Sequence, residues 1–165
     1  MVSSPIPNPD VFQDKDFLVF NKCFKNIFKG RENVKILVSL SGGSDSVLLL
    51  YLMLRFFQSN NQNITAAHIN HNLRTNSIDD QKFIAELGKV LKVETIIRQL
   101  NPIDKTKKES IESWAREGRY KILNELAIET ESDVIVTGHH KNDQVETILK
   151  NLSEQAGLYL SLIHI

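Results

Sequence analysis

The chain has 165 residues, of which 41% are apolar and 24% are charged, with 20 basic and 20 acidic side chains. This length and composition fit a single globular domain and exclude a disordered chain, which would combine low hydrophobicity with high net charge. Because the formal net charge is zero, bulk charge cannot hold a polyanion, so contacts with a nucleic acid must come from local patches or from parts outside this chain.

Helix and strand patterns alternate along the chain after a first helix. That helix is predicted from about residue 10 to Gly30, because its apolar side chains recur at spacings of three and four. Strands are predicted at 34–39, 64–69, 93–100 and 133–137. Further helices are predicted at 45–57, 77–91, 110–129 and 142–152. In the helix at 77–91 the side chains expected to face inward are Ile78, Phe83, Ile84, Leu87 and Leu91.

Strands that alternate with helices in this way require parallel pairing through right-handed crossovers. The strands are apolar on both faces, as expected where helices cover both sides of a sheet. The predicted fold is therefore α/β, an open, mainly parallel, doubly wound sheet with helices on both faces. We expect a helical extension at 1–33, a catalytic domain at 34–152 and a truncated or artefactual tail at 153–165. Ligands of such sheets bind at the carboxyl ends of the strands.

The remaining features favour a soluble cytoplasmic domain without membrane contact. The longest uninterrupted apolar run, residues 47–54, is far too short to span a bilayer. The first ten residues contain three prolines and lack the pattern of a secretory signal. The single cysteine, Cys23, excludes an internal disulfide, a cysteine-based zinc site and a Cys-x-x-Cys redox pair.

Residues 41–46, Ser-Gly-Gly-Ser-Asp-Ser, lie between a predicted strand and a predicted helix. Two glycines allow a tight turn with exposed N–H groups, the serines add hydroxyl donors, and the helix start adds the positive end of its dipole. This combination predicts a phosphate cradle, although a loop that only reverses the chain could have the same composition. The segment matches neither the Walker A nor the Gly-x-Gly-x-x-Gly pattern. Because no lysine is placed to meet a γ-phosphate, Asp45 instead suggests Mg²⁺ on a pyrophosphate group.

The same segment resembles the Ser-Gly-Gly-x-Asp-Ser signature of the PP-loop ATP pyrophosphatase superfamily, whose members cleave ATP to AMP and pyrophosphate while adenylating a substrate oxygen. Three later segments are similar to motifs of the tRNA(Ile)-lysidine synthetases. They are 68–74 (His-Ile-Asn-His-Asn-Leu-Arg), 112–120 (Glu-Ser-Trp-Ala-Arg-Glu-Gly-Arg-Tyr) and 138–147 (Gly-His-His-Lys-Asn-Asp-Gln-Val-Glu-Thr). Four motifs in the same order make this a specific resemblance, and it implies an adenine nucleotide alpha-hydrolase-like fold of the PP-loop type.

The resemblance implies a site for ATP and Mg²⁺. The expected ATP-binding residues are Ser41, Gly42, Gly43, Ser44, Asp45, Ser46 and His68. The expected magnesium ligands are Asp45 and Asp143, and the expected catalytic residues are Asp45, Arg116, His139, Asp143 and Glu146. Arg116 or His139 would supply a cation to the departing pyrophosphate. Asp143 or Glu146 would position the ammonium group of lysine and take its proton.

Each later motif also has a simpler interpretation. Glu112 and Arg116 could form an ion pair on a solvated helix face. Asp143 and Glu146 could complement a helix dipole. His68 and His71 could in principle bind a metal, but no cysteine or third ligand is nearby in the sequence, so a hydrogen-bonding role at the nucleotide pocket is favoured.

The reaction implied by the resemblance joins free L-lysine to the wobble cytidine of isoleucine tRNA with a CAU anticodon, giving lysidine, AMP and pyrophosphate. One alternative is another PP-loop enzyme, such as a tRNA thiolase or an amidotransferase-type synthetase. Thiolases of this superfamily generally use cysteines near the site, and Cys23 has no cysteine partner. The other alternative is a non-catalytic adenine-nucleotide-binding module. A homodimer is compatible with all of these.

The sequence departs from the family pattern in two places. Asn142 stands where many relatives carry an acidic residue, which removes a carboxylate beside Asp143. The chain also stops soon after the fourth motif, so we expect domains that bind the tRNA body to lie beyond it. We interpret residues 160–165 as a truncated or artefactual end.

Overall fold

The computed structural model describes residues 14–28, 33–57, 63–71, 77–100, 110–138, 147–149 and 162–163. The helices in these ranges are α1 (Asp14–Ile27), α2 (Ser44–Phe56), α3 (Ser77–Leu91) and α4 (Ile111–Glu129). The strands are β1 (Ile36–Ser39), β2 (Ile64–Asn70), β3 (Glu94–Gln99), β4 (Val134–Thr137), β5 (Thr147–Leu149) and β6 (Leu162–Ile163). None of the described helices is both long enough and apolar enough to cross a membrane.

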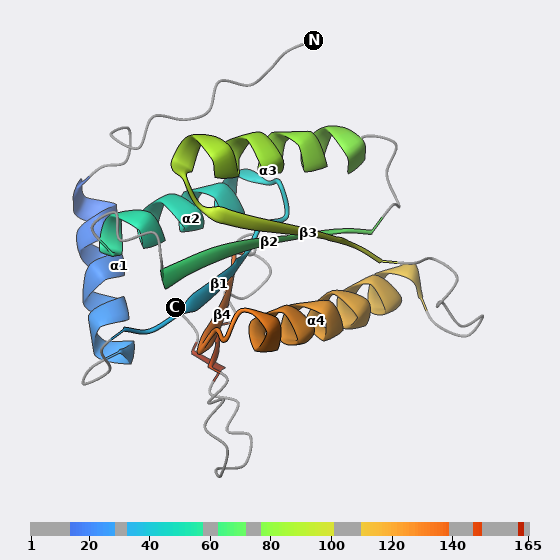
Figure 1. Cartoon of the computed structure of the whole chain (residues 1–165). Helices are drawn as coiled ribbons and strands as arrows, with labels where there is room; N and C mark the ends of the chain where they lie inside the picture. The colour runs from blue at the N-terminus through green and yellow to red at the C-terminus, as the bar shows by residue number, and fades with distance from the viewer. Residues whose placement is uncertain are drawn as a thin grey trace.

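The strands form one sheet with the order β3-β2-β1-β4-β5-β6. The first four are mutually parallel, whereas β5 and β6 join antiparallel at the β4 side. Figure 1 shows α1, α2 and α3 on one side of the sheet and α4 on the other. The predicted fold, an open and mainly parallel doubly wound sheet, is therefore confirmed.

The two faces of the sheet build two separate cores, because alternate residues of a strand point to opposite faces. In β1, Ile36 and Val38 pack with the apolar side chains of α1, α2 and α3, including Phe24 and Leu50. Leu37 belongs to the second core, in which α4 contributes its buried residues Trp114, Leu123, Leu126 and Ala127. Burial on both faces explains why these strands consist of nearly continuous apolar residues.

Three predictions about the elements are wrong in detail. The helix predicted at 142–152 does not extend through Thr147–Leu149, which forms β5 against Val134–Thr137. Without β5, β4 would be an open edge with unpaired N–H and C=O groups, and the β-branched run at 147–148 suits strand pairing. Ile78 does not face inward, since 61% of its surface is exposed. β3 is not apolar on both faces either, because it forms the other edge of the sheet and its residues are half-buried or exposed.

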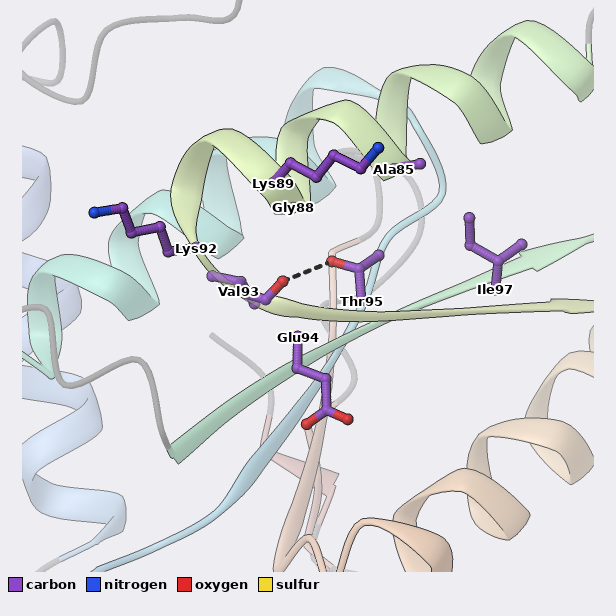
Figure 2. Close-up of a pocket in the computed structure, with 8 residues that line it drawn as sticks. All are labelled: Ala85, Gly88, Lys89, Lys92, Val93, Glu94, Thr95 and Ile97. Carbon is purple, nitrogen blue, oxygen red and sulfur yellow. Dashed lines mark hydrogen bonds between the residues drawn. The ribbon is translucent and has the colours of Figure 1, made fainter.

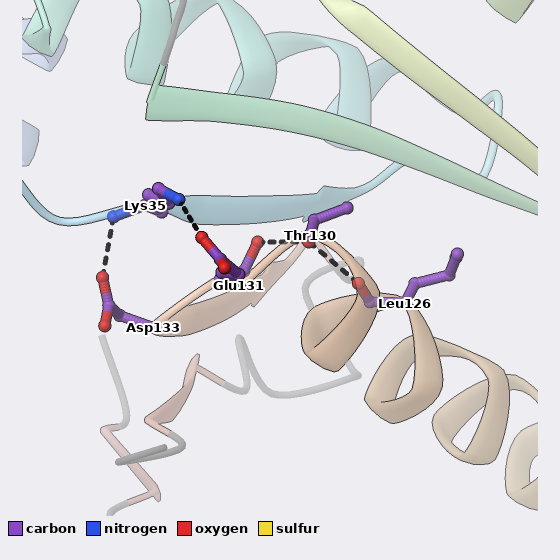
Figure 3. A network of polar contacts seen from close by, with 6 residues as sticks. Lys35, Leu126, Thr130, Glu131 and Asp133 are labelled. Carbon is purple, nitrogen blue, oxygen red and sulfur yellow. Dashed lines mark hydrogen bonds and ion pairs between the residues drawn. The ribbon is translucent and has the colours of Figure 1, made fainter. Parts of the chain in front are cut away.

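Polar contacts join β1 to β4 at the amino ends of these strands (Figure 3). The Lys35 backbone N–H donates to Asp133 Oδ2 at 2.9 Å, and Lys35 Nζ contacts Glu131 Oε2 at 2.7 Å. The hydrogen bond and charge of this exposed pair raise the pKa of Lys35 and lower the pKa of Glu131. These contacts align β1 with β4 at the edge opposite the carboxyl ends of the strands.

Close packing of α3 on β3 leads to a prediction about stability (Figure 2). A Cβ on Gly88 would overlap Thr95 Oγ1 and lie 2.9 Å from Thr95 Cβ, and that hydroxyl is held by a 3.1 Å bond to Val93 O. We expect Gly88→Ala to lower the free energy of unfolding by about 1–2 kcal/mol, because the overlap outweighs the better helix propensity of alanine. Gly118→Ala is the matched control. The three atoms nearest to its Cβ would be Cδ1, Cδ2 and Cγ of Leu100, at 2.5, 2.8 and 3.2 Å, and this branched end can change rotamer. Thermal unfolding of both variants tests this, and equal losses would contradict it.

Candidate functional site: the loop between β1 and α2

The loop of residues 40–43 connects the carboxyl end of β1 to the start of α2. β1 lies between β2 and β4, and the chain moves outward from it through β2 and β3 before α4 crosses back to β4. The strand order therefore reverses between β1 and β4. Open α/β sheets bind ligands at the carboxyl ends of the strands beside such a reversal. The serine–glycine segment predicted to bind phosphate occupies this position.

The loop is ordered by the side chains of Ser41 and of Ser46, which lies in the first turn of α2. Ser46 Oγ donates to Gly43 O at 2.8 Å and lies 3.2 Å from both the backbone N and the Oγ of Ser41. The Gly43 N–H donates to Ser41 Oγ at 3.3 Å. Ser46 is 1% exposed, whereas Ser41 and Ser44 are exposed. The two serines bearing exposed surface are the ones that can reach a ligand.

Two glycines are required by the backbone at this site. Gly42 has a φ of +89°, a conformation that side chains with a Cβ rarely adopt. Gly138 ends β4 directly against the start of α2, where a Cβ would lie 3.1 Å from Asp45 O and 3.2 Å from Ser46 Cα. The end of β4 and the first turn of α2, which follows the loop, are therefore closely packed through their backbones.

Helix α2 begins without a side-chain cap. Its N-cap residue is Gly43, which forms no cap hydrogen bond, whereas the N-cap Ser110 of α4 accepts a bond from the Ser113 N–H at 3.1 Å. The first N–H groups of a helix have no partner within the helix and carry its positive partial charge. An anion at this position can accept their hydrogen bonds. Asp45 lies in the same first turn, half-buried, with Oδ1 3.4 Å from Ser44 Oγ.

His68 supports the entrance to the loop from β2. It is 4% exposed, and its Nδ1 lies 2.8 Å from Leu40 O. A carbonyl oxygen can only accept, so Nδ1 donates and carries the ring proton, which leaves Nε2 as an acceptor when the ring is neutral. The Leu40 N–H in turn donates to Ala67 O at 2.8 Å. Among the residues that the structure describes, no three or more His, Cys, Asp or Glu side chains cluster so as to hold a metal ion.

The start of α3 places two polar residues, Asp80 and Gln81, at the carboxyl ends of the strands beside the loop. The sequence patterns did not indicate these residues. A Cβ on Gly42 would lie 3.5 Å from both Cβ and Cγ of Asp80, so this half-buried carboxylate borders the loop. A second polar contact links β2 to α3. Asn70, buried at the end of β2, donates through Nδ2 to Oε1 of Gln81 in α3 at 3.2 Å. An acidic residue in the first turn of a helix suggests only a dipole effect from sequence, and the proximity of Asp80 to Gly42 arises from tertiary packing.

The motif on α4 presents a group of stacked cationic side chains. The Arg116 and Arg119 guanidinium carbons lie 5.4 and 5.5 Å from the centre of the Tyr120 ring. Arg116 is exposed, and its guanidinium group lies over the Tyr120 ring. The ion pair with Glu112 that the sequence allows stays a prediction. An arginine stacked on an aromatic face can still donate its in-plane N–H groups to an anion. The role of Arg116 toward ATP stays a prediction.

The fourth motif continues from Gly138 into residues 139–146, which lie outside the described residues. His139, Asp143 and Glu146 fall in this range, so their catalytic roles and the magnesium ligand Asp143 stay predictions. The described structure does fix where this segment begins. Gly138 packs against Asp45 and Ser46, and the chain therefore leaves β4 beside the loop.

A parallel α/β sheet with an uncapped, glycine-containing loop at its switch point defines a nucleotide-binding domain. The sequence profile of the PP-loop domain matches residues 18–164. The chain belongs to the PP-loop domain family, whose members bind ATP.

Curated relatives agree with this assignment. The chain is 40% identical over 134 residues to the tRNA(Ile)-lysidine synthase of Pseudothermotoga lettingae, covering 80% of this chain and 29% of that protein. It is 35% identical over 146 residues to the tRNA(Ile)-lysidine synthase of Clostridium perfringens strain ATCC 13124, covering 87% and 30%. These matches confirm the resemblance that the four motifs indicated. The chain spans about 30% of the length of these relatives.

Solved structures share the fold. The U34-tRNA thiolase NcsA from Methanococcus maripaludis, with its [4Fe-4S] cluster, has a TM-score of 0.62 at 22% identity, covering 78% of this chain and 48% of that one. The NH₃-dependent NAD synthetase from Campylobacter jejuni, in complex with nitrate, has a TM-score of 0.61 at 18% identity, covering 78% and 57%. At these identities the likeness concerns the architecture of the sheet and its helices.

Proposed function

We propose that this chain is the ATP-binding catalytic part of a tRNA(Ile)-lysidine synthase. The observation that carries the proposal is the uncapped start of α2 behind a positive-φ glycine, at the switch point of the sheet. The shared motifs and the names of the relatives select the tRNA reaction among the reactions of PP-loop enzymes. A tRNA-modifying enzyme would act in the cytoplasm, where its substrate is.

The loop would hold the two phosphates that leave ATP as pyrophosphate. Backbone N–H groups at the start of α2 would donate to the phosphate oxygens. The exposed hydroxyls of Ser41 and Ser44 would join them by rotating away from their present acceptors, Ser46 Oγ and Asp45 Oδ1. The His68 Nε2 acceptor fits a hydroxyl or amino group of the nucleoside better than it fits a phosphate. This arrangement stabilises negative charge that grows on pyrophosphate as its bond to the α-phosphorus breaks.

The residues of the loop also fit a magnesium ion. Mg²⁺ is usually held by one or two carboxylates together with substrate phosphates and water. Asp45 offers one half-buried carboxylate at the start of α2, and we propose Asp143 as the second. When bound, Mg²⁺ would neutralise charge on the phosphate oxygens.

The proposed reaction has two steps. The C2 carbonyl oxygen of the wobble cytidine in isoleucine tRNA with a CAU anticodon attacks the α-phosphorus of ATP, and pyrophosphate leaves. The neutral ε-amino group of L-lysine then attacks C2, and AMP leaves with the former carbonyl oxygen, giving lysidine. We propose that Arg116 and His139 place positive charge near the phosphates, and that Asp143 and Glu146 orient lysine and take the proton from its amine.

The thiolase alternative has less support, although a thiolase shares the fold. Iron–sulfur clusters are held by several cysteine thiolates. Cys23 is the single cysteine of these 165 residues, and it lies in α1, which covers one face of the sheet. For a non-catalytic nucleotide-binding module, Asp45, His139 and Asp143 together would be more than simple binding requires, although Asp45 alone would suit a module that binds ATP with Mg²⁺.

Pyrophosphate release separates the three functions. We expect a full-length enzyme that contains this chain to release pyrophosphate and AMP from ATP when both CAU-anticodon tRNA and L-lysine are present. Transfer of radiolabelled lysine to the tRNA should match pyrophosphate release one to one. Incorporation of sulfur instead of lysine would support a thiolase, and ATP binding without turnover would support a binding module. Cleavage of ATP to ADP would contradict the proposal.

A further inference from the structure

Ser46 differs from Ser41 and Ser44 in that its side chain is buried. It lies in the first turn of α2, and only 1% of its surface is exposed, although its neighbours Ser44 and Asp45 reach the solvent. Its side chain therefore points beneath the loop rather than into the space above α2 where an anion would bind.

The hydroxyl of Ser46 has no hydrogen-bonding capacity left for a ligand. A serine hydroxyl has one proton to donate and two lone pairs that accept. The Ser46 proton goes to Gly43 O at 2.8 Å, because a carbonyl oxygen can only accept. One lone pair accepts the Ser41 N–H and the other accepts the Ser41 hydroxyl proton, each at 3.2 Å.

Backbone packing also fixes Ser46 in place. A Cβ on Gly138 would lie only 3.2 Å from Ser46 Cα, so the end of β4 closes the space on that side. Ser41 links Ser46 to Gly43 as well, because its Oγ donates to Ser46 Oγ and accepts the Gly43 N–H at 3.3 Å. Ser46 thus ties residues 41 and 43, on both sides of the positive-φ Gly42, to the helix.

We propose that Ser46 is a positioning residue that holds the loop in its anion-binding shape from beneath and does not itself contact the phosphates. This assignment replaces the direct ATP-binding role predicted from the sequence, and it rests on the proposed function only for the identity of the anion. A preformed loop spares ATP the cost of ordering residues 41–43 on binding.

Amide hydrogen exchange of the ligand-free 165-residue chain, followed by NMR, tests this role without nucleotide. We expect Ser46→Ala to accelerate exchange of the Ser41 amide about tenfold, because that N–H loses its acceptor. We expect the same variant to weaken ATP binding about tenfold, because the loop must then be ordered by the ligand. Ser113→Ala is the matched control, since its hydroxyl contacts only Glu117 within α4 among the described residues. It should leave both quantities unchanged.

The two measurements distinguish the outcomes. Weaker ATP binding with unchanged Ser41 exchange would make Ser46 a direct phosphate ligand and overturn the proposal, as would no change in either quantity. If the unsubstituted chain binds no ATP, the proposed function fails, whereas faster Ser41 exchange in Ser46→Ala would still establish the positioning role.

Ser41→Ala provides a second variant with the opposite signature, should Ser46→Ala not fold. It removes the acceptor of the Gly43 N–H but leaves the residue 41 N–H bonded to Ser46 Oγ. We expect exchange at Gly43 to rise about tenfold while exchange at residue 41 stays protected. Loss of protection at residue 41 in this variant would overturn the proposal.

Discussion

Asp45→Ala should abolish pyrophosphate release while leaving the fold intact. Asp45 offers a carboxylate in the first turn of α2, beside the proposed phosphate site, and without a cation the charge of the departing pyrophosphate is not neutralised. We expect a loss of at least about 100-fold in turnover, the size seen when one main electrostatic contact of a transition state is removed. Folding should lose the interaction of one acidic residue with the α2 dipole, about 0.3–1 kcal/mol, together with the 3.4 Å contact between Asp45 Oδ1 and Ser44 Oγ.

Two measurements give this prediction its specificity. For the 165-residue chain, Mg²⁺ should tighten ATP binding before the substitution and do so far less after it, when Asp143 is the one proposed carboxylate ligand left. In the full-length enzyme, the Asp45→Ala substitution should stop lysine transfer to tRNA. Asp79→Ala is the matched control, because Asp79 is an exposed acidic residue in the first turn of α3 and loses the same dipole interaction. Unchanged lysine transfer by the Asp45→Ala enzyme would disprove the role of Asp45.

Gly138→Ala should damage both stability and ATP binding. The new methyl group would lie 3.1–3.3 Å from backbone atoms of Asp45 and Ser46, and these atoms belong to the start of α2 and cannot rotate away as a side chain would. Relief requires β4 and α2 to move apart, at a cost of about 1–3 kcal/mol. The same movement displaces the loop, so we expect ATP affinity to fall about tenfold or more.

Gly88→Ala separates the two effects of Gly138→Ala. Gly88 packs against Thr95 at the interface of α3 and β3, so its substitution should lower the unfolding temperature without changing ATP affinity. Thermal unfolding and isothermal titration with ATP of both variants test this. If ATP affinity falls equally in both variants, the loss reflects general destabilisation. The contact between Gly138 and the start of α2 would then have no specific role in ATP binding.

Much of the fold could be predicted from residue patterns because each element carries its own periodic signal. The apolar run before Ser41 and the three-and-four spacing in 110–129 specified β1 and α4 within two residues. The helix prediction at 142–152 was wrong at Thr147–Leu149, where the open edge of β4 offers hydrogen bonds that local spacing does not reveal. Ile78 likewise fits the helical spacing of an inward position, but it lies in the first turn of α3 and is largely exposed.

The sequence by itself determined the alternation of strands and helices, the position of a serine–glycine loop after a buried strand, and the resemblance to a PP-loop enzyme. Only the tertiary structure decided that Ser46 points inward, that Gly138 touches the start of α2 and that Asp80 borders Gly42. The physical reason is range. Periodicity records which face of one element is buried, whereas contacts between β4, α3 and the loop depend on the strand order of the whole sheet.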